Sequence, residues 1–176
     1  LSFILPGELI GADFLGGSEN HFAVRALTDI QLCEFDPEQL VSLLTKTHDT
    51  TMHMLAVLGH HCKDLEETIY SLGKCSAMER MANLIVGLRA RIAASEGSGA
   101  LQFDLPLRRY DFADALGLTP VHVSRTFAQL KSNRVLEFRS GILQILNEAR
   151  LLELASALYR SRAPMNADAA NEAAAS

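Results

Sequence analysis

Apolar residues recur along the middle of the chain with the period of a helix that is buried on one side. Between residues 49 and 72 they are spaced alternately by four and three positions, as in a two-stranded coiled coil. This heptad seam consists of Thr51, Leu55, Leu58, Cys62, Leu65, Ile69 and Leu72. Because no seam residue is charged, the pattern predicts a dimerisation helix that pairs without an effector. A single amphipathic helix packed on its own domain is the alternative interpretation.

Shorter apolar segments flank this helix. Residues 22–27 and 30–35 have the composition of short strands, and residues 5–8 have that of a turn. The pair Asp36-Pro37 predicts a helix start, because aspartate caps free N–H groups and proline fits the first helical position. A further helix is predicted over 76–94, where a serine and a glutamate three residues apart fit a capping box.

A helix pair joined by glycine is predicted near the C-terminal end. Residues 111–116 form a short helix in this interpretation, and Gly117 supplies the left-handed turn that follows it. Thr119 and Pro120 then cap and begin a second helix over 121–131. This order of elements is the helix-turn-helix pattern.

A hairpin follows the helix pair directly. Two apolar strands around Ser140-Gly141 predict this "wing", which completes a winged helix-turn-helix over residues 106–146. A glycine-linked helix pair alone occurs in many helical proteins, whereas a pair followed by a wing is far more specific. The pattern therefore predicts a DNA-binding domain whose second helix enters the major groove.

The outward face of the second helix supplies the candidate DNA contacts. The residues predicted to read bases are Val121, His122, Ser124, Arg125 and Gln129. Those predicted to contact phosphates are Arg108, Arg109, Thr119 and Lys131. Arg125 is the strongest base reader, because its fork matches guanine O6 and N7. The alternatives are a solvated surface pair for Arg108 and Arg109, and an ion pair with Asp111 or Asp114 for Arg125.

The net charge of −5 argues against nucleic acid when the chain is taken as a whole. Residues 106–140 nevertheless hold six basic side chains against three acidic ones.

Three cysteines without metal-site spacing indicate a reducing cytoplasm. We expect no membrane span and no signal peptide, and no enzyme, since nucleophile–base pairs, metal spacing and phosphate loops are lacking. The start at Leu1 leads us to expect that an N-terminal portion is missing.

Several segments together resemble the Crp/Fnr family of bacterial transcription regulators. They are Leu5-Pro6-Gly7-Glu8-Leu9-Ile10-Gly11, Val24-Arg25-Ala26-Leu27-Thr28, Ala77-Met78-Glu79-Arg80, Leu116-Gly117-Leu118-Thr119 and Val123-Ser124-Arg125. The resemblance implies an α+β fold with the remainder of a cyclic-nucleotide-binding-like β-roll over 1–48 and a dimerisation helix over 49–75. A winged helix-turn-helix domain over 76–160 and a disordered tail over 161–176 would follow.

The resemblance also bears on cofactors. Family members that bind cyclic AMP carry a Glu after the cassette glycine and an Arg-Ser before the next strand, where this chain has Ala12 and Asn20-His21-Phe22. We therefore expect no tight cyclic AMP binding. Cys33 aligns with an iron–sulfur ligand of the Fnr branch, although a half-buried strand residue is the plainer interpretation. Cys62 is expected to be a small apolar filler of the seam, and Cys75, near a helix junction, the likeliest exposed thiol. An iron–sulfur cluster or haem would need residues N-terminal to this chain, and the histidines of the long helix are expected to be solvated.

The function implied is that of a homodimeric regulator that binds two-fold operator sequences in double-stranded promoter DNA. Sensor control and contact with RNA polymerase are implied by the resemblance alone. Family members place a Glu at the position of Val121, so the operator half-site is expected to differ from the usual one. The alternatives are a ligand- or redox-sensing dimer module with weak or no DNA binding, and a scaffolding dimer.

Overall fold

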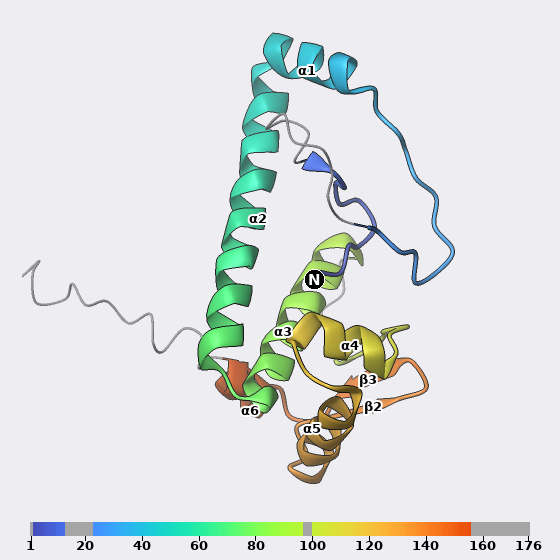
Figure 1. Cartoon of the computed structure of the whole chain (residues 1–176), viewed down its shortest axis with the longest axis vertical. Helices are drawn as coiled ribbons and strands as arrows, with labels where there is room; N and C mark the ends of the chain where they lie inside the picture. The colour runs from blue at the N-terminus through green and yellow to red at the C-terminus, as the bar shows by residue number, and fades with distance from the viewer. Residues whose placement is uncertain (1, 13–22, 97–99, 156–176) are drawn as a thin grey trace, which may run out of the picture.

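The computed structural model describes residues 2–12, 23–96 and 100–155, and it combines helices with one small antiparallel sheet. In chain order the elements are α1 (Pro37–Lys46), α2 (His48–Lys74), α3 (Ala77–Glu96), β1 (Gln102–Asp104), α4 (Arg109–Leu116), α5 (Pro120–Ser132), β2 (Leu136–Arg139), β3 (Ile142–Ile145) and α6 (Glu148–Ala155). This composition confirms the predicted α+β class. Figure 1 shows α2 as a long rod, with α1 at one end and α3 to α6 gathered with the sheet at the other.

The core lies between α3 and the elements that follow it. Each of those elements except β1 contributes buried apolar side chains, and β1 contributes the partly buried Phe103. The largest fully buried ones are Met81, Ile85, Leu88, Phe112, Val123, Leu130, Val135, Leu136, Leu143 and Leu151. Leu143 lies on the central strand, opposite Phe103 of β1 and Phe138 of β2. The sheet thus forms one wall of the core that supports α4 and α5.

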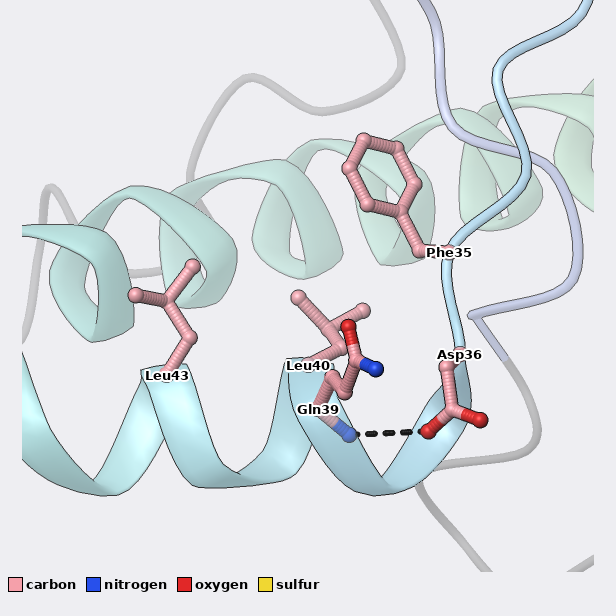
Figure 2. Close-up of a pocket in the computed structure, with 5 residues that line it drawn as sticks. All are labelled: Phe35, Asp36, Gln39, Leu40 and Leu43. Carbon is pink, nitrogen blue, oxygen red and sulfur yellow. Dashed lines mark hydrogen bonds between the residues drawn. The ribbon is translucent and has the colours of Figure 1, made fainter.

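The helix starts follow the local signals in the sequence. Asp36 caps α1, with its Oδ1 accepting a hydrogen bond of 3.0 Å from the Gln39 N–H, and Pro37 takes the first helical position. Figure 2 shows this cap beside Phe35, Leu40 and Leu43, which line a shallow pocket along α1. The predicted capping box of α3 is also present, because Ser76 N–H donates to Glu79 Oε2 at 2.8 Å and Glu79 N–H to Ser76 Oγ at 3.4 Å.

The long helix α2 presents its seam to solvent. None of its residues is buried, and Leu65 and Ile69 are 63% and 71% exposed. Thr51 is engaged within the chain, because its hydroxyl donates to the carbonyls of Leu44 and Thr47 where α1 meets α2. The exposed apolar part of the seam therefore begins at Leu55. Within the residues described, no helix has the length and apolar character needed to cross a bilayer.

The two predicted N-terminal strands are not formed, and this prediction is wrong for the residues described. Residues 23–36 have no regular secondary structure, and those of 22–27 and 30–35 that are described are exposed. A strand needs a neighbour to satisfy its N–H and C=O groups, and the only sheet in the described residues is β1-β3-β2. The turn predicted at 5–8 is present, since Glu8 N–H donates to the Leu5 carbonyl at 3.1 Å. Residue 22 and the tail predicted over 161–176 lie outside the described residues.

The residues near the start of the described chain, from Phe3 to Glu8, pack on α3. Phe3 and Leu5 contact the core, and Arg91 of α3 reaches the Glu8 carboxylate with Nε–Oε1 and Nη2–Oε2 distances of 2.8 and 2.5 Å. Burial alone would raise the pKa of Glu8, but the hydrogen bonds from Arg91 and the Leu5 N–H outweigh it and leave that pKa below its ordinary value. This ion pair anchors the segment to the C-terminal domain.

Arg80 ties together the end of α2, the start of α3 and the end of α4. Its guanidinium donates to three backbone carbonyls, with Nε to Cys75 at 2.9 Å, Nη2 to Leu72 at 2.8 Å and Nη1 to Leu116 at 3.1 Å. These carbonyls lie at helix C-termini, where a cation is electrostatically favoured. One side chain therefore connects the seam helix to the helix-turn-helix.

Two elements, β1 and α6, were not anticipated. β1 has only three residues and acquires its strand geometry by pairing with β3, as in Phe103 opposite Leu143. α6 packs on α3, where it buries Leu151 and Ala155, and the ion pair between Arg89 and Glu148 joins the two helices at 2.6 Å. Both elements depend on distant partners that local patterns do not reveal.

We expect Gly117→Ala to destabilise the protein by about 1–2 kcal/mol, because a side chain at a left-handed residue is strained. Gly117 has φ of 61°, and a Cβ there would lie 3.0 Å from Leu72 Cδ2. Chemical denaturation measures the loss. Gly87→Ala on α3 is the matched control, since no atom lies within 4 Å of its Cβ position, and it should stabilise by up to about 1 kcal/mol. Equal effects of the two substitutions would contradict this account of Gly117.

Candidate DNA-binding surface

The turn between α4 and α5 has the geometry that the sequence predicts. Gly117 is left-handed, and its N–H donates to the Ala113 carbonyl to end α4. Thr119 then caps α5, its Oγ1 accepting from the His122 N–H at 3.2 Å, and Pro120 occupies the first turn. The two helices pack directly on each other (Figure 1). They form a helix-turn-helix whose second helix is α5.

The helix α5 is divided into a buried and an exposed face. Val123, Thr126, Phe127 and Leu130 are buried, with exposures of 5% or less. The exposed face carries all five residues predicted to read bases, namely Val121, His122, Ser124, Arg125 and Gln129, together with Ala128. Ala128 was not among the predicted site residues. The helix period of 3.6 residues accounts for this division.

Three aromatic rings hold α5 in this orientation. Phe112 of α4 meets Phe127 of α5 edge to face with centroids 5.1 Å apart, and it meets Phe138 of β2 in the same way at 5.3 Å. Phe127 and Phe138 are stacked with centroids 5.2 Å apart. Such pairs stabilise a fold by about 0.5–1.5 kcal/mol beyond the area that they bury. The cluster fixes the rotation of α5 relative to α4 and the wing.

Arg109 belongs to this cluster, which differs from the phosphate-contacting position expected at the rim. Its guanidinium carbon lies 4.4 Å from the Phe127 ring centroid and 5.2 Å from that of Phe138. Nη1 is buried without a hydrogen-bond partner among the described residues, and burial lowers the pKa of the guanidinium. The neighbouring Arg108 is exposed, as predicted. The helix therefore turns only one of two adjacent arginines towards solvent.

One of the two alternative partners of Arg125, Asp111, is occupied by other groups, and no ion pair between Arg125 and the other, Asp114, is found among the described residues. The buried carboxylate of Asp111 accepts from the Arg108 N–H at 2.7 Å and from Arg25 Nη2 at 2.5 Å. In the part of the chain that the structure describes, no ion pair or hydrogen bond of the Arg125 guanidinium is found. Arg125 thus projects from α5 as a cation that is available to a ligand.

Lys131 lies at the end of α5 and contacts the wing. Its Nζ is 2.6 Å from Glu137 Oε1, and Arg139 Nε lies 3.6 Å from the same oxygen. The hydrogen bond from Lys131 is the main reason why the pKa of Glu137 lies below its ordinary value. The predicted wing itself is confirmed, since β2 and β3 pair in register and are joined at Ser140 and Gly141, with φ of 51° and 79°.

Cys75 and Cys33 differ from their predicted environments. Cys75, expected to be the most exposed thiol, is 7% exposed because it ends α2 and packs beside Asn83. Cys33, expected to be half-buried in a strand, is exposed, and so is Cys62. His53, His60 and His61 are exposed, as predicted. No group of three metal-ligating side chains occurs within the described residues.

These features define the class of the protein: a winged helix-turn-helix fold of the kind that binds DNA. Residues 79–154 match the Crp-like helix-turn-helix domain family. This segment is thus a Crp-like helix-turn-helix domain, and the chain as a whole is similar to regulators of the Crp/Fnr family. It is 29% identical over 161 residues to the fumarate and nitrate reduction regulatory protein of Vibrio cholerae, covering 92% of this chain and 64% of that protein. It is 33% identical over 156 residues to the transcriptional activator FnrL of Cereibacter sphaeroides, covering 85% and 63%.

The solved structure of FixK2 from Bradyrhizobium japonicum has the same fold. It is 27% identical with a TM-score of 0.59, and the match covers 66% of this chain and 57% of that one. A structure of CprK in complex with OCPA matches with a TM-score of 0.52 at 18% identity, covering 68% and 55%, and this likeness concerns the fold alone. The chain spans less than two thirds of the length of the curated relatives named above.

We expect Arg109→Ala to lower the free energy of unfolding by about 1 kcal/mol, because it removes a cation and its aliphatic stem from two rings. Arg108→Ala changes the adjacent exposed side chain and should cost less than about 0.5 kcal/mol. Chemical denaturation of the two variants measures the difference. A loss that is the same for both would show that the ring contacts of Arg109 do not stabilise the domain.

Proposed function

We propose that this protein is a DNA-binding transcription regulator that acts as a homodimer on a two-fold operator. The observation that carries the proposal is the outward face of α5, on which Arg125 projects without a partner among the described residues. The second helix of a helix-turn-helix enters the major groove with its N-terminal residues near base edges. The family of the chain and the names of its relatives support the same function.

The residues proposed to read bases lie together on the exposed face of α5. Arg125 binds guanine through O6 and N7, and Ser124, His122 and Gln129 offer shorter polar contacts on either side. Val121, which is 61% exposed near the start of α5, contacts a thymine methyl and cannot accept a hydrogen bond from cytosine. The operator half-site is therefore proposed to carry guanine opposite Arg125 and no requirement for cytosine opposite Val121.

The phosphate contacts are proposed at the rim of this face. Arg108 and Thr119 are exposed at the starts of the two helices, and Lys131 is exposed at the end of α5. The Thr119 oxygen accepts the capping hydrogen bond, which leaves its hydroxyl hydrogen free to be donated to a phosphate. Arg109 is withdrawn from this group because its guanidinium packs on Phe127 and Phe138.

Dimerisation is proposed along α2. The seam residues Leu55, Leu65, Ile69 and Leu72 are all exposed, and a stripe of this kind is buried in coiled coils by a second helix. A two-fold pair of helix-turn-helix domains contacts half-sites about one helical turn apart. Control by an N-terminal sensor and contact with RNA polymerase belong to the same proposal, and they rest on the family alone.

We expect Arg125→Ala to weaken binding to the preferred operator by about 1–3 kcal/mol and to relax the preference at one base pair of each half-site. The operator is first selected from a random duplex library and the variant is then titrated by fluorescence anisotropy. Arg150→Ala on α6 removes the same charge from an exposed arginine that is paired with Glu153, and it should leave the preference intact. If both variants keep the wild-type preference, Arg125 is not a base reader.

We expect Leu65→Glu to convert the dimer into a monomer, because it would bury a charge in the seam. His60 lies on the face of α2 opposite the seam and is exposed, so His60→Glu adds the same charge without entering the contact. Sedimentation velocity at micromolar concentration distinguishes the two. A monomeric wild-type protein, or a dimer that survives in Leu65→Glu, would refute pairing through this seam.

A further inference from the structure

We propose that Glu137 acts as an electrostatic latch that holds Lys131 and Arg139 in the free protein and thereby limits its affinity for DNA of any sequence. The inference rests on the proposed DNA-binding function and concerns how that surface is regulated. The three side chains form one cluster on the outer side of the domain, where the end of α5 meets the wing.

The geometry of the cluster follows from two local features. Side chains alternate along a strand, so Leu136 and Phe138 face the core while Glu137 and Arg139 share the outer face of β2. The end of α5 is a tight turn, in which Val135 N–H donates to the Leu130 carbonyl and Arg134 N–H to the Lys131 carbonyl, both at 2.9 Å. This turn places Lys131 beside the outer face of the strand.

The three side chains differ in their access to solvent. Glu137 is 24% exposed, whereas Lys131 and Arg139, which both lie against its Oε1, are 57% and 80% exposed. A shallow groove lined by Glu137, Arg139, Ile142 and Gln144 continues along the wing. A phosphate thus reaches the cations before it reaches the carboxylate, and it competes with that carboxylate for them.

This competition lowers the affinity of the protein for DNA. DNA affinity depends on the number of phosphates that protein cations neutralise. Each contact by Lys131 or Arg139 requires its interaction with Glu137 to weaken, and the approaching phosphate is also repelled by the carboxylate. Contacts of this kind carry no sequence information, so the latch reduces sequence-independent binding and leaves the bases read by Arg125 unchanged.

The test compares wild type with Glu137→Gln on two duplexes, one of random sequence and one carrying the selected operator. We expect the variant to bind the random duplex about threefold to tenfold more tightly at low salt. The gain should shrink as salt is added, and the plot of log affinity against log salt should become steeper by up to about 0.9 per phosphate gained. The ratio of operator to random affinity should not rise.

Glu148→Gln is the matched control, because it removes a carboxylate of equal charge that pairs with Arg89 between α3 and α6. Thermal unfolding confirms that both variants are folded. A gain of equal size in Glu148→Gln would overturn the latch, since net charge alone would then account for it.

A double-mutant cycle distinguishes two effects of Glu137, its pairing with Lys131 and Arg139 and its direct repulsion of DNA phosphates. In a chain that already carries Lys131→Met and Arg139→Met, Glu137→Gln should no longer raise the affinity to the same extent. If the full gain persists there, Glu137 acts by repelling DNA and the latch is overturned. If wild type binds DNA and Glu137→Gln leaves affinity and slope unchanged, the latch alone is overturned. A wild-type chain that binds neither duplex removes the proposed function and the latch together.

Discussion

The packing of one face of α5 against three aromatic rings is the constraint on which the proposed function depends. Phe112, Phe127 and Phe138 come from α4, α5 and β2, and each ring contacts the other two. Because this contact fixes how α5 is rotated, the residues between the buried positions must face solvent. The proposed DNA-binding surface is thus the face of α5 that lies opposite its hydrophobic contact.

The junction between α2 and the C-terminal domain couples the proposed dimer contact to the proposed DNA contact. Leu72 is the last seam residue, and its side chain lies against the position of Gly117 in the helix-turn-helix. Arg80 joins the same two regions through the carbonyls of Leu72 and Leu116. A rotation of α2 relative to α2 of the second copy in the proposed dimer would therefore move the turn that precedes α5. This contact gives a direct physical route for regulation.

The charged side chains of the domain fall into two groups, those that are paired within the residues described and those that are not. Asp111 and Glu137 are partly or fully buried and already bind Arg25 and Lys131, whereas Arg125 projects freely within the described residues. A local positive excess in the sequence does not separate cations that are engaged from cations that are available. That separation governs how strongly the surface attracts a phosphate backbone, because a paired cation must first release its partner.

The sequence by itself determined the features that arise from neighbouring residues. The heptad spacing of α2, the caps at Asp36 and Thr119, and the turns at Gly117 and Ser140-Gly141 all appear where local chemistry predicts them, because each needs contacts within a few residues only. The same locality allowed the exposed face of α5 to be predicted from its period.

Only the tertiary structure decided the rest, because it depends on partners far away in the chain. Within the part of the chain that the structure describes, residues 23–36 have no strand to pair with and are irregular, whereas three residues at β1 become a strand by pairing with β3. Arg108 and Arg109 are adjacent and chemically identical, yet the rings of Phe127 and Phe138 withdraw only the second. Cys75 is buried by the helices that meet around it, a consequence of three-dimensional packing that no local pattern contains.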